Sequence, residues 1–235
     1  PHAAAFVDHL NSAGVAYYIV TNDSARLPET TSRRLGEMGL EVPAERVISS
    51  GGLLAQHFAE HDLAGVDCAV LGPEDSCRLV EMAGGRLVEP GEDAPVLVLC
   101  DELGFDFVET MDRALSRLLW RLDRGLPVHM VAPNPDIIYP KSGWEFGFTA
   151  GGMALMMEAA MRVRFPARDD LNFISLGKPN APIFQEALRR AGTRDVVMVG
   201  DQLGTDVLGA NRMDLPSALA TTGLSSLADC EAQQI

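Results

Sequence analysis

The sequence has few aromatic residues and few positive charges. Phe, Trp and Tyr make up 6% of its 235 residues, so a core must consist mainly of Leu, Val, Ala and Met. Lys and Arg number 19 against 33 Asp and Glu, which gives a formal net charge of −14. Because a surface of that charge repels phosphate backbones, we expect no nucleic-acid partner. A bound phosphate group would need a locally positive site made by a cation, a lysine or backbone N–H groups.

Cysteines are few and long apolar runs are missing. The four cysteines have no CxxC spacing, so they predict neither a disulfide framework nor a zinc site. We expect reduced thiols in a cytoplasmic protein. No apolar run approaches the roughly 20 residues that span a bilayer, and no signal peptide is visible, so we expect no membrane partner.

Two phosphate-binding motifs are also missing. Neither GxGxxG nor GxxxxGK followed by Ser or Thr occurs in the chain. These motifs cradle dinucleotides and nucleoside triphosphates in many α/β domains. Their absence disfavours a plain nucleotide-binding domain.

Short apolar runs alternate with helical patterns along the chain, which is typical of parallel α/β architecture. Strands are expected at residues 15–20, 47–48, 67–71, 96–100, 128–132, 173–176, 196–199 and 217–221. We predict a doubly wound, Rossmann-like parallel sheet core formed by residues 1–63 and 173–235. A second α/β unit, residues 64–172, would be inserted between them as a cap domain.

One predicted helix, residues 108–122, has a single apolar stripe with steps of three and four residues. We expect this stripe to pack on the helix's own sheet rather than to form an interface. Met156 and Met157, in a later Met-rich helix, are interpreted as core residues.

Three polar clusters stand directly after predicted strands: Thr21-Asn22, Gly177-Lys178-Pro179 and Gly200 to Asp206. In open parallel sheets the carboxyl ends of the strands line the ligand crevice, so residues far apart in sequence can meet in one pocket. The joint arrangement favours a functional site, although each cluster alone is also compatible with an ordinary turn.

The residue types suit phosphoryl transfer, which needs positioning and neutralisation of the phosphoryl oxygens. The Thr21 hydroxyl can hold one oxygen, and Lys178 supplies a positive charge. Asp201 at a strand tip is a suitable Mg²⁺ ligand, and Gly200 allows the tight turn there. Asp206 falls at a predicted helix start. The alternatives are a turn hydroxyl for Thr21, a surface lysine for Lys178, a turn former for Asp201 and a helix N-cap for Asp206.

The three clusters resemble motifs of the haloacid-dehalogenase-like phosphatases. VTN at residues 20–22 looks like the second motif, GKP at 177–179 like the third, and GDQLGTD at 200–206 like the fourth. Ser49-Ser50, NPDIIYP at 134–140 and AGGM at 150–153 resemble the subgroup with a large α/β cap after the second motif. That subgroup includes p-nitrophenylphosphatases and sugar and nucleotide phosphatases.

This resemblance implies a Mg²⁺-dependent phosphomonoesterase that acts on a small phosphorylated metabolite, such as a sugar phosphate or nucleotide, through an aspartyl-phosphate. Thr21 and Lys178 would bind the transferring phosphoryl group, and Asn22 would contact it through its backbone. Asp201 would bind the magnesium, and Asp206 would support the metal site.

The cap is also given a role by the resemblance. The loop NPDIIYP would face the pocket, which makes Asn134, Asp136 and Tyr139 candidates for substrate choice. Caps of this kind often mediate dimerisation, so a homodimer through the cap is expected as one possibility.

The sequence departs from the family pattern in two ways. The family's first motif, an aspartate pair that supplies the nucleophile and the general acid and base, is not found, and we expect it on a strand upstream of Pro1. Asp23 stands where related sequences often have Asn, and its charge would disfavour a dianionic ligand unless it points away or selects amine or hydroxyl groups. These departures leave an alternative open, a catalytically inactive relative that binds a phosphorylated ligand.

Overall fold

The computed structural model describes residues 3–142, 144–221 and 225. Its α-helices are α1 (Ala3–Ser12), α2 (Pro28–Glu37), α3 (Leu54–Glu60), α4 (Glu74–Met82), α5 (Phe107–Leu122), α6 (Ala150–Arg164), α7 (Ala181–Ala191) and α8 (Leu208–Arg212). Its strands are β1 (Ile19–Thr21), β2 (Val47–Ser49), β3 (Asp67–Leu71), β4 (Arg86–Val88), β5 (Val96–Leu99), β6 (His129–Val131), β7 (Ile138–Ser142), β8 (Glu145–Phe148), β9 (Met198–Gly200) and β10 (Ser217–Leu219). The fold is α/β, as expected.

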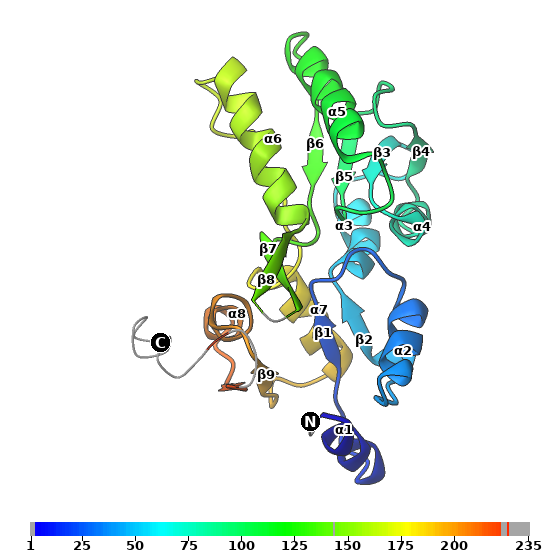
Figure 1. The fold of residues 1–235 in the computed structure, drawn as a ribbon, viewed down its shortest axis with the longest axis vertical. Coiled ribbons are helices and arrows are strands. Elements are labelled where there is room, and N and C mark those ends of the chain that lie inside the picture. Colours follow the sequence, from blue (N-terminus) through cyan, green and yellow to red (C-terminus); the bar gives the residue numbers. More distant parts are fainter. Residues whose placement is uncertain (1–2, 143, 222–224, 226–235) are drawn as a thin grey trace.

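The largest sheet has four parallel strands in the order β4-β3-β5-β6. Helices cover both of its faces, because successive side chains of a strand point to opposite sides. Leu97 and Leu99 of β5 belong to the apolar cluster with α5 and α6. Val96 and Val98 belong to the cluster with α3 and α4. Figure 1 shows this unit at one end of the molecule, with α1, α2, α7 and α8 at the other.

Helix α3 therefore packs on the four-stranded sheet. Its Phe58 is fully buried and shares a cluster with Cys68 and Val70 of β3. The boundary that we predict between residues 63 and 64 separates this helix from the sheet that it covers. The division into core and cap stays a prediction.

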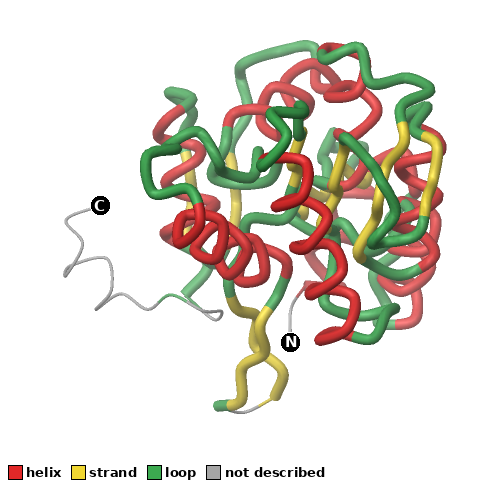
Figure 2. The backbone as a smooth tube through the Cα atoms, turned by 90° about the horizontal axis from the view of Figure 1, so that it is seen from above, coloured by secondary structure: helices red, strands yellow, loops and turns green. Residues whose placement is uncertain are grey.

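The remaining strands form small sheets. The pairs β1–β2 and β9–β10 are each parallel, and in the described part of the chain they are not joined to one another. The hairpin β7–β8 is antiparallel, and Figure 2 shows it projecting from the body of the molecule.

Three strand predictions need correction. Residues 173–176 form no strand but a single bridge in which Ile174 pairs with Val131, because the backbone of Ile174 bonds only to Met130 and Ala132 before the chain leaves the sheet. The strand expected at 15–20 is half-buried and reduced to Ile19–Thr21. The strand expected to be buried at 196–199 leaves Val197 and Val199 57% and 53% exposed, because both point to the face opposite Met198, which packs against the core.

The helix predictions fare better. In α5, Met111, Leu118 and Leu122 are buried in the cluster beneath the sheet, as the apolar stripe predicts, whereas Val108 at its start is 67% exposed. In α6, Met157 is buried at 2% exposure, whereas Met156 is 57% exposed, so the core interpretation was wrong for Met156. Adjacent helical residues point in directions about 100° apart, and only one of the two can face the sheet.

Candidate functional site

The first and second polar clusters meet through the side chain of Asn22. Its Oδ1 accepts a hydrogen bond from the Lys178 backbone N–H at 2.7 Å, and its Nδ2 donates to the Lys178 carbonyl at 2.9 Å. The same Nδ2 donates to Asp136 Oδ1 of the loop after β6 at 3.0 Å. Gly177 is required by this contact, because a Cβ there would lie 2.5 Å from Asn22 Oδ1. One buried amide thus joins two strand ends to the predicted cap loop.

The second and third clusters meet through a buried ion pair. Lys178 Nζ lies 2.7 Å from Asp206 Oδ1, with side chains 13% and 4% exposed. Asp206 Oδ2 accepts hydrogen bonds from the backbone N–H groups of Asp201 and Gln202, each at 3.1 Å. A Cβ on Gly200 would lie 2.2 Å from the Asp206 carboxylate, so only glycine leaves room for this turn. Asp206 therefore fixes both the lysine and the loop that carries Asp201.

This donor set fits a divalent cation. The half-buried Asp201 carboxylate stands at the tip of β9. Asp206 already accepts three hydrogen bonds, so it suits the supporting role that the resemblance implies rather than direct contact with an ion. Mg²⁺ is typically held by one or two carboxylates, with water and phosphate oxygens completing the shell.

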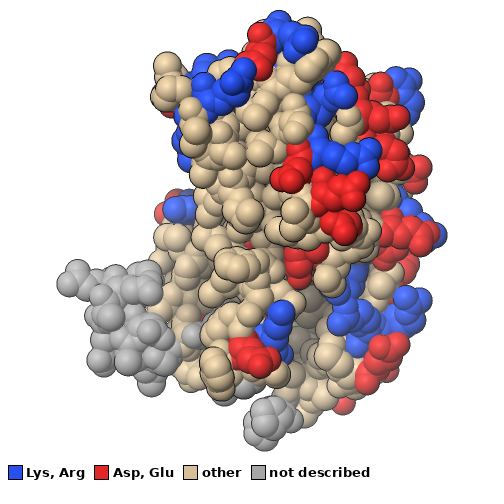
Figure 3. Space-filling model, turned by 45° about the horizontal axis from the view of Figure 1, so that its top comes forward, with Lys and Arg blue, Asp and Glu red and all other residues tan. Residues whose placement is uncertain are grey.

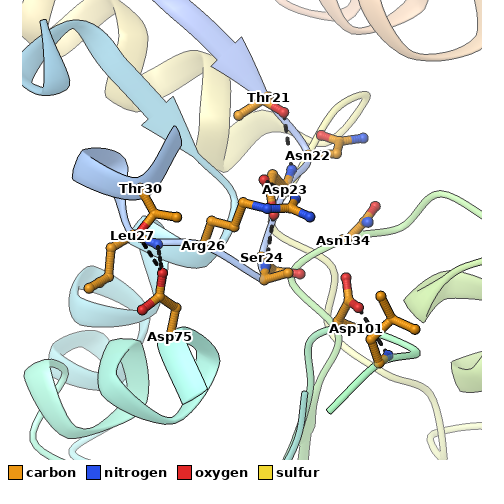
Figure 4. Close-up of polar contacts among 12 residues, drawn as sticks. Thr21, Asn22, Asp23, Ser24, Arg26, Leu27, Thr30, Asp75, Asp101 and Asn134 are labelled. Atoms are coloured by element: carbon orange, nitrogen blue, oxygen red, sulfur yellow. Dashed lines mark hydrogen bonds and ion pairs between the residues drawn. The ribbon is translucent and has the colours of Figure 1, made fainter. Parts of the chain in front are cut away.

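The first cluster forms a tight loop after β1. Thr21 Oγ1 accepts a hydrogen bond from the Asp23 N–H at 3.2 Å, and Ser50 Oγ donates to the Asn22 carbonyl at 2.7 Å. Asp23 does not stand alone: its Oδ2 lies 2.8 Å from the Arg26 guanidinium (Figure 4). The charge that would disfavour a phosphate ligand is thus balanced by Arg26, a residue that our sequence reasoning missed. The i,i+3 spacing of the pair is the signal that could have indicated it.

The loop after β6 brings two of its three predicted residues to this network. Asp136 bonds to Asn22, and burial raises its carboxyl pKa, against the opposing effects of the Asn22 hydrogen bond and the nearby Lys178. Asn134 holds the turn, because its Oδ1 accepts from the Asp136 N–H at 2.9 Å and its Nδ2 donates to Thr149 Oγ1 at 3.0 Å. Tyr139 lies in β7, within the hairpin. The Lys141 ammonium stands over its ring, with Nζ 5.8 Å from the ring centroid.

Steric crowding explains the glycine at position 151, near the start of α6. A Cβ on Gly151, near the start of α6, would lie 2.2 Å from the Pro135 carbonyl oxygen. The Gly151 N–H instead donates to the Asp136 carbonyl at 2.9 Å. The Gly-rich start of α6 thereby lets the helix pack directly against the loop that reaches Asn22.

The four-stranded unit also holds the loop after β1 from a second side. Ser24 Oγ donates to the Cys100 carbonyl at 2.5 Å, and Ser76 Oγ donates to the Ser24 carbonyl at 2.9 Å. Asp75 Oδ2 accepts hydrogen bonds from Leu27 N–H and Thr30 Oγ1 at 3.2 and 2.7 Å (Figure 4). Residues 24–30 therefore sit between the first polar cluster and the ends of β3 and β5.

Asp101, directly after β5, is a second carboxylate that our sequence reasoning missed. Figure 4 shows it across from the loop that carries Asp23 and Arg26. Burial raises its pKa to about 6, with smaller raising effects from Glu102 and Asp23 and opposing effects from the Leu103 N–H and Arg26. No motif marks this residue, because its place at the site depends on how the sheet packs.

Asp101→Asn is expected to raise the free energy of unfolding at pH 8 by about 1 kcal/mol, a figure reduced for solvent screening of a partly exposed group. The folded pKa of about 6 lies above the ordinary 3.8, so ionisation costs more in the folded state. The free energy of unfolding of the wild-type protein therefore falls by about this amount as pH rises from about 4 to 6, and that of the variant does not. Urea unfolding at pH 3.5 and pH 8 measures the difference, with the exposed Asp112→Asn as control. An equal gain in the free energy of unfolding at both pH values would contradict a raised pKa of Asp101.

A parallel α/β fold with a lysine and carboxylates brought together by its loops is typical of enzymes that act on anionic ligands. Comparison with known families narrows this class. A model described as haloacid dehalogenase-like hydrolase matches residues 1–86, and one described as HAD-hydrolase-like matches residues 175–235, together more than half of the chain. The chain belongs to the haloacid-dehalogenase-like hydrolases.

Individual relatives agree with this family assignment. An acid sugar phosphatase of Staphylococcus saprophyticus is 26% identical, with 99% of this chain and 84% of the relative covered. The crystal structure of a possible sugar phosphatase from Cytophaga hutchinsonii is 28% identical with a TM-score of 0.84, covering 99% of this chain and 82% of that one. The structure of a p-nitrophenyl phosphatase from Archaeoglobus fulgidus is 25% identical with a TM-score of 0.79. It covers 100% of this chain and 86% of that one.

Other sequence expectations concern thiols and membranes. Cys68, Cys77 and Cys100 are free thiols, and burial raises the pKa of Cys68 to about 11 and that of Cys100 to about 12. Cys230 lies outside the described residues. In the part of the chain that the structure describes, no helix combines the length and apolar character needed to cross a membrane.

Proposed function

We propose that this hydrolase is a Mg²⁺-dependent phosphomonoesterase that acts on a small phosphorylated metabolite, with a sugar phosphate as the first candidate. The observation that carries the proposal is the convergence of the three polar clusters through Asn22, Lys178 and Asp206. Through these contacts, Asp206 holds both the Lys178 ammonium and the loop that carries Asp201. The names of the related acid sugar phosphatase and possible sugar phosphatase support the substrate class.

Each residue has a distinct role in this proposal. Lys178 uses one of its three N–H donors on Asp206 and has two left for phosphoryl oxygens. Thr21 supplies its hydroxyl, and Asn22 its backbone N–H. A Mg²⁺ ion bound by Asp201 would neutralise charge on the phosphoryl group. The aspartate pair that the resemblance implies would supply the attacking carboxylate and the general acid and base.

The split sheet suggests where that pair would stand. We propose that the strand carrying it lies between β1 and β9, where it would join the two parallel pairs. A strand in that position would place its carboxyl end beside Thr21 and Asp201, which follow the neighbouring strand tips.

We assign substrate choice to residues of the loops after β5 and β6 and of strand β7. Asp136 and Asp101 offer carboxylate oxygens, which suit the hydroxyl groups of a sugar better than an anionic or apolar group. We propose that they act with Asn134 and Tyr139 in this selection. Asp23 would contribute through the Arg26 pair rather than as an isolated charge.

Two further expectations remain proposals. A homodimer would use the exposed apolar residues of the predicted cap, among them Trp144, Phe146 and Phe148 of the β7–β8 region and Val163 of α6. Figure 3 shows a broad uncharged area over the left and centre of the view, with most of the acidic side chains on the right of the same view. Free, buried thiols are compatible with a cytoplasmic location.

The test is phosphate release by the purified protein carrying the expected aspartate pair, from p-nitrophenyl phosphate and a panel of sugar phosphates and nucleotides. We expect activity with Mg²⁺, loss with excess EDTA and recovery when Mg²⁺ is restored. If a folded protein with the pair releases no phosphate but is stabilised against heat by a phosphorylated compound, the alternative of an inactive binding protein replaces this proposal.

A further inference from the structure

Three of the five histidines lie together, away from the polar clusters. His57 and His61 stand one turn apart, in α3 and directly after it, and His129 is the first residue of β6. His57 Nε2 lies 2.8 Å from His129 Nε2, and the ring centroids of the three residues are 4.2 to 5.0 Å apart. One ring nitrogen from each residue falls within 4.8 Å of the other two. We propose that His57, His61 and His129 bind a divalent transition metal, with Zn²⁺ the best match, and so join helix α3 to β6.

The hydrogen bonds set the ring nitrogens in suitable roles. His61 Nδ1 lies 2.9 Å from the His57 carbonyl oxygen, which can only accept, so this nitrogen carries the proton. The Nε2 of His61 then has a free lone pair. A backbone carbonyl bonded to the second ring nitrogen is the usual arrangement that orients a metal-binding histidine.

The other two histidines face each other through Nε2. At present one of these nitrogens donates to the other. A metal between them requires that both protons sit on Nδ1, a tautomer shift that leaves each imidazole neutral and releases no proton. In a tetrahedral site with Zn–N bonds of about 2.0–2.1 Å, ligand nitrogens stand roughly 3.3 Å apart, so the pair needs to open by about 0.5 Å.

Burial and charge keep the site ready for a cation. Burial, with His61 and His129 adding, lowers the pKa of His57 to about 4, and burial also lowers the pKa of His129. Burial thus favours the neutral form of both rings, whose nitrogens offer lone pairs. Glu60 acts in the opposite direction on His57, as a nearby negative charge would. The exposed His61 gives the ion access from solvent.

The chemistry separates this site from the proposed catalytic one. Three imidazole nitrogens suit Zn²⁺, Cu²⁺ or Ni²⁺, whereas Mg²⁺ prefers oxygen ligands. Three protein ligands leave a fourth position for water. His129 stands at the amino end of β6, five residues before Asn134, which corresponds to roughly 16 Å of extended chain. The metal would thus fix the sheet at the end remote from the substrate.

The experiment uses the whole protein in excess Mg²⁺, titrated with Zn²⁺ by calorimetry and with Co²⁺ by absorption spectroscopy. We expect one Zn²⁺ per chain, an intense tetrahedral Co²⁺ band, and a rise in Tm of about 5 °C at saturation. His61→Gln, an exposed change that leaves the core intact, is expected to weaken Zn²⁺ binding about 100-fold and to abolish the band. His129→Gln should act in the same direction.

His9→Gln is the matched control, because His9 is an exposed histidine of α1 outside the cluster. It should bind Zn²⁺ like the wild type. The proposal is overturned if Zn²⁺ does not bind, or if His61→Gln keeps the wild-type affinity and Co²⁺ band, which would place the ion elsewhere. Phosphatase activity is not the readout, so failure of this site and failure of the proposed function are distinguishable.

Discussion

Lys178→Met is expected to lower kcat/KM for phosphate release by about 10³-fold. The substitution keeps an unbranched side chain of similar length but removes the ammonium that we assign to the phosphoryl oxygens. Hydrogen-bond donors aimed at developing negative charge in a protected site are typically worth 10²–10³-fold each, and a charged donor stands at the upper end. The measurement is steady-state hydrolysis of p-nitrophenyl phosphate with saturating Mg²⁺.

Lys141→Met is the matched control, because Lys141 is the only other lysine of the chain and is exposed in β7. Its kcat/KM should stay within about threefold of the wild type. Since Lys178→Met also leaves the Asp206 carboxylate without its counter-ion, circular dichroism must first show that the variant is folded. A folded Lys178→Met enzyme with activity within tenfold of the wild type would remove Lys178 from the catalytic site.

Asp206→Asn is expected to lower the free energy of unfolding by about 3–5 kcal/mol. The carboxylate is 4% exposed in its side chain and accepts bonds from Lys178 Nζ and from the N–H groups of Asp201 and Gln202. An asparagine amide has only one acceptor oxygen, so its NH₂ group must face either the ammonium or the two backbone donors. Removing one partner of a buried pair typically costs this much, because the other charge stays buried without compensation.

Urea unfolding at pH 7 measures this loss, and the exposed Asp195→Asn is the control for removing one negative charge, with an expected change within about 0.5 kcal/mol. The double variant Lys178→Met with Asp206→Asn should cost less than the sum of the two single changes, because they share one interaction. If Asp206→Asn is as stable as Asp195→Asn, the pair does not hold these two strand ends together.

The location of the candidate site could be predicted from sequence because its residues follow strands. Val20, Leu176 and Val199 precede the polar clusters, and the carboxyl ends of parallel segments share one edge. Residues 173–176 make only one bridge, but Gly177 still lies beside Asn22, because the turn there depends on the close approach of the Asn22 side chain. The motif resemblance rests on the same short segments.

The three histidines and the position of Asp101 opposite Asp23 could not be found in this way. Asp101 faces Asp23 only because β5 ends beside the loop after β1. His57 meets His129 only because α3 covers the four-stranded sheet, a packing that the predicted boundary at residue 63 did not anticipate. Such contacts join segments 72 or more residues apart, and no local pattern records them.

The sequence alone determined the α/β class, the apolar stripe of residues 108–122 and the polar residues at the strand ends, because these depend on periodicity and on local turn chemistry. Tertiary structure decided which partner each of these residues has: Asp206 for Lys178, and Asn22 for the Asp136 loop. The reason is physical. The direction of a side chain is set by its own element, whereas the charge and burial that it meets come from elements packed against it from distant parts of the chain.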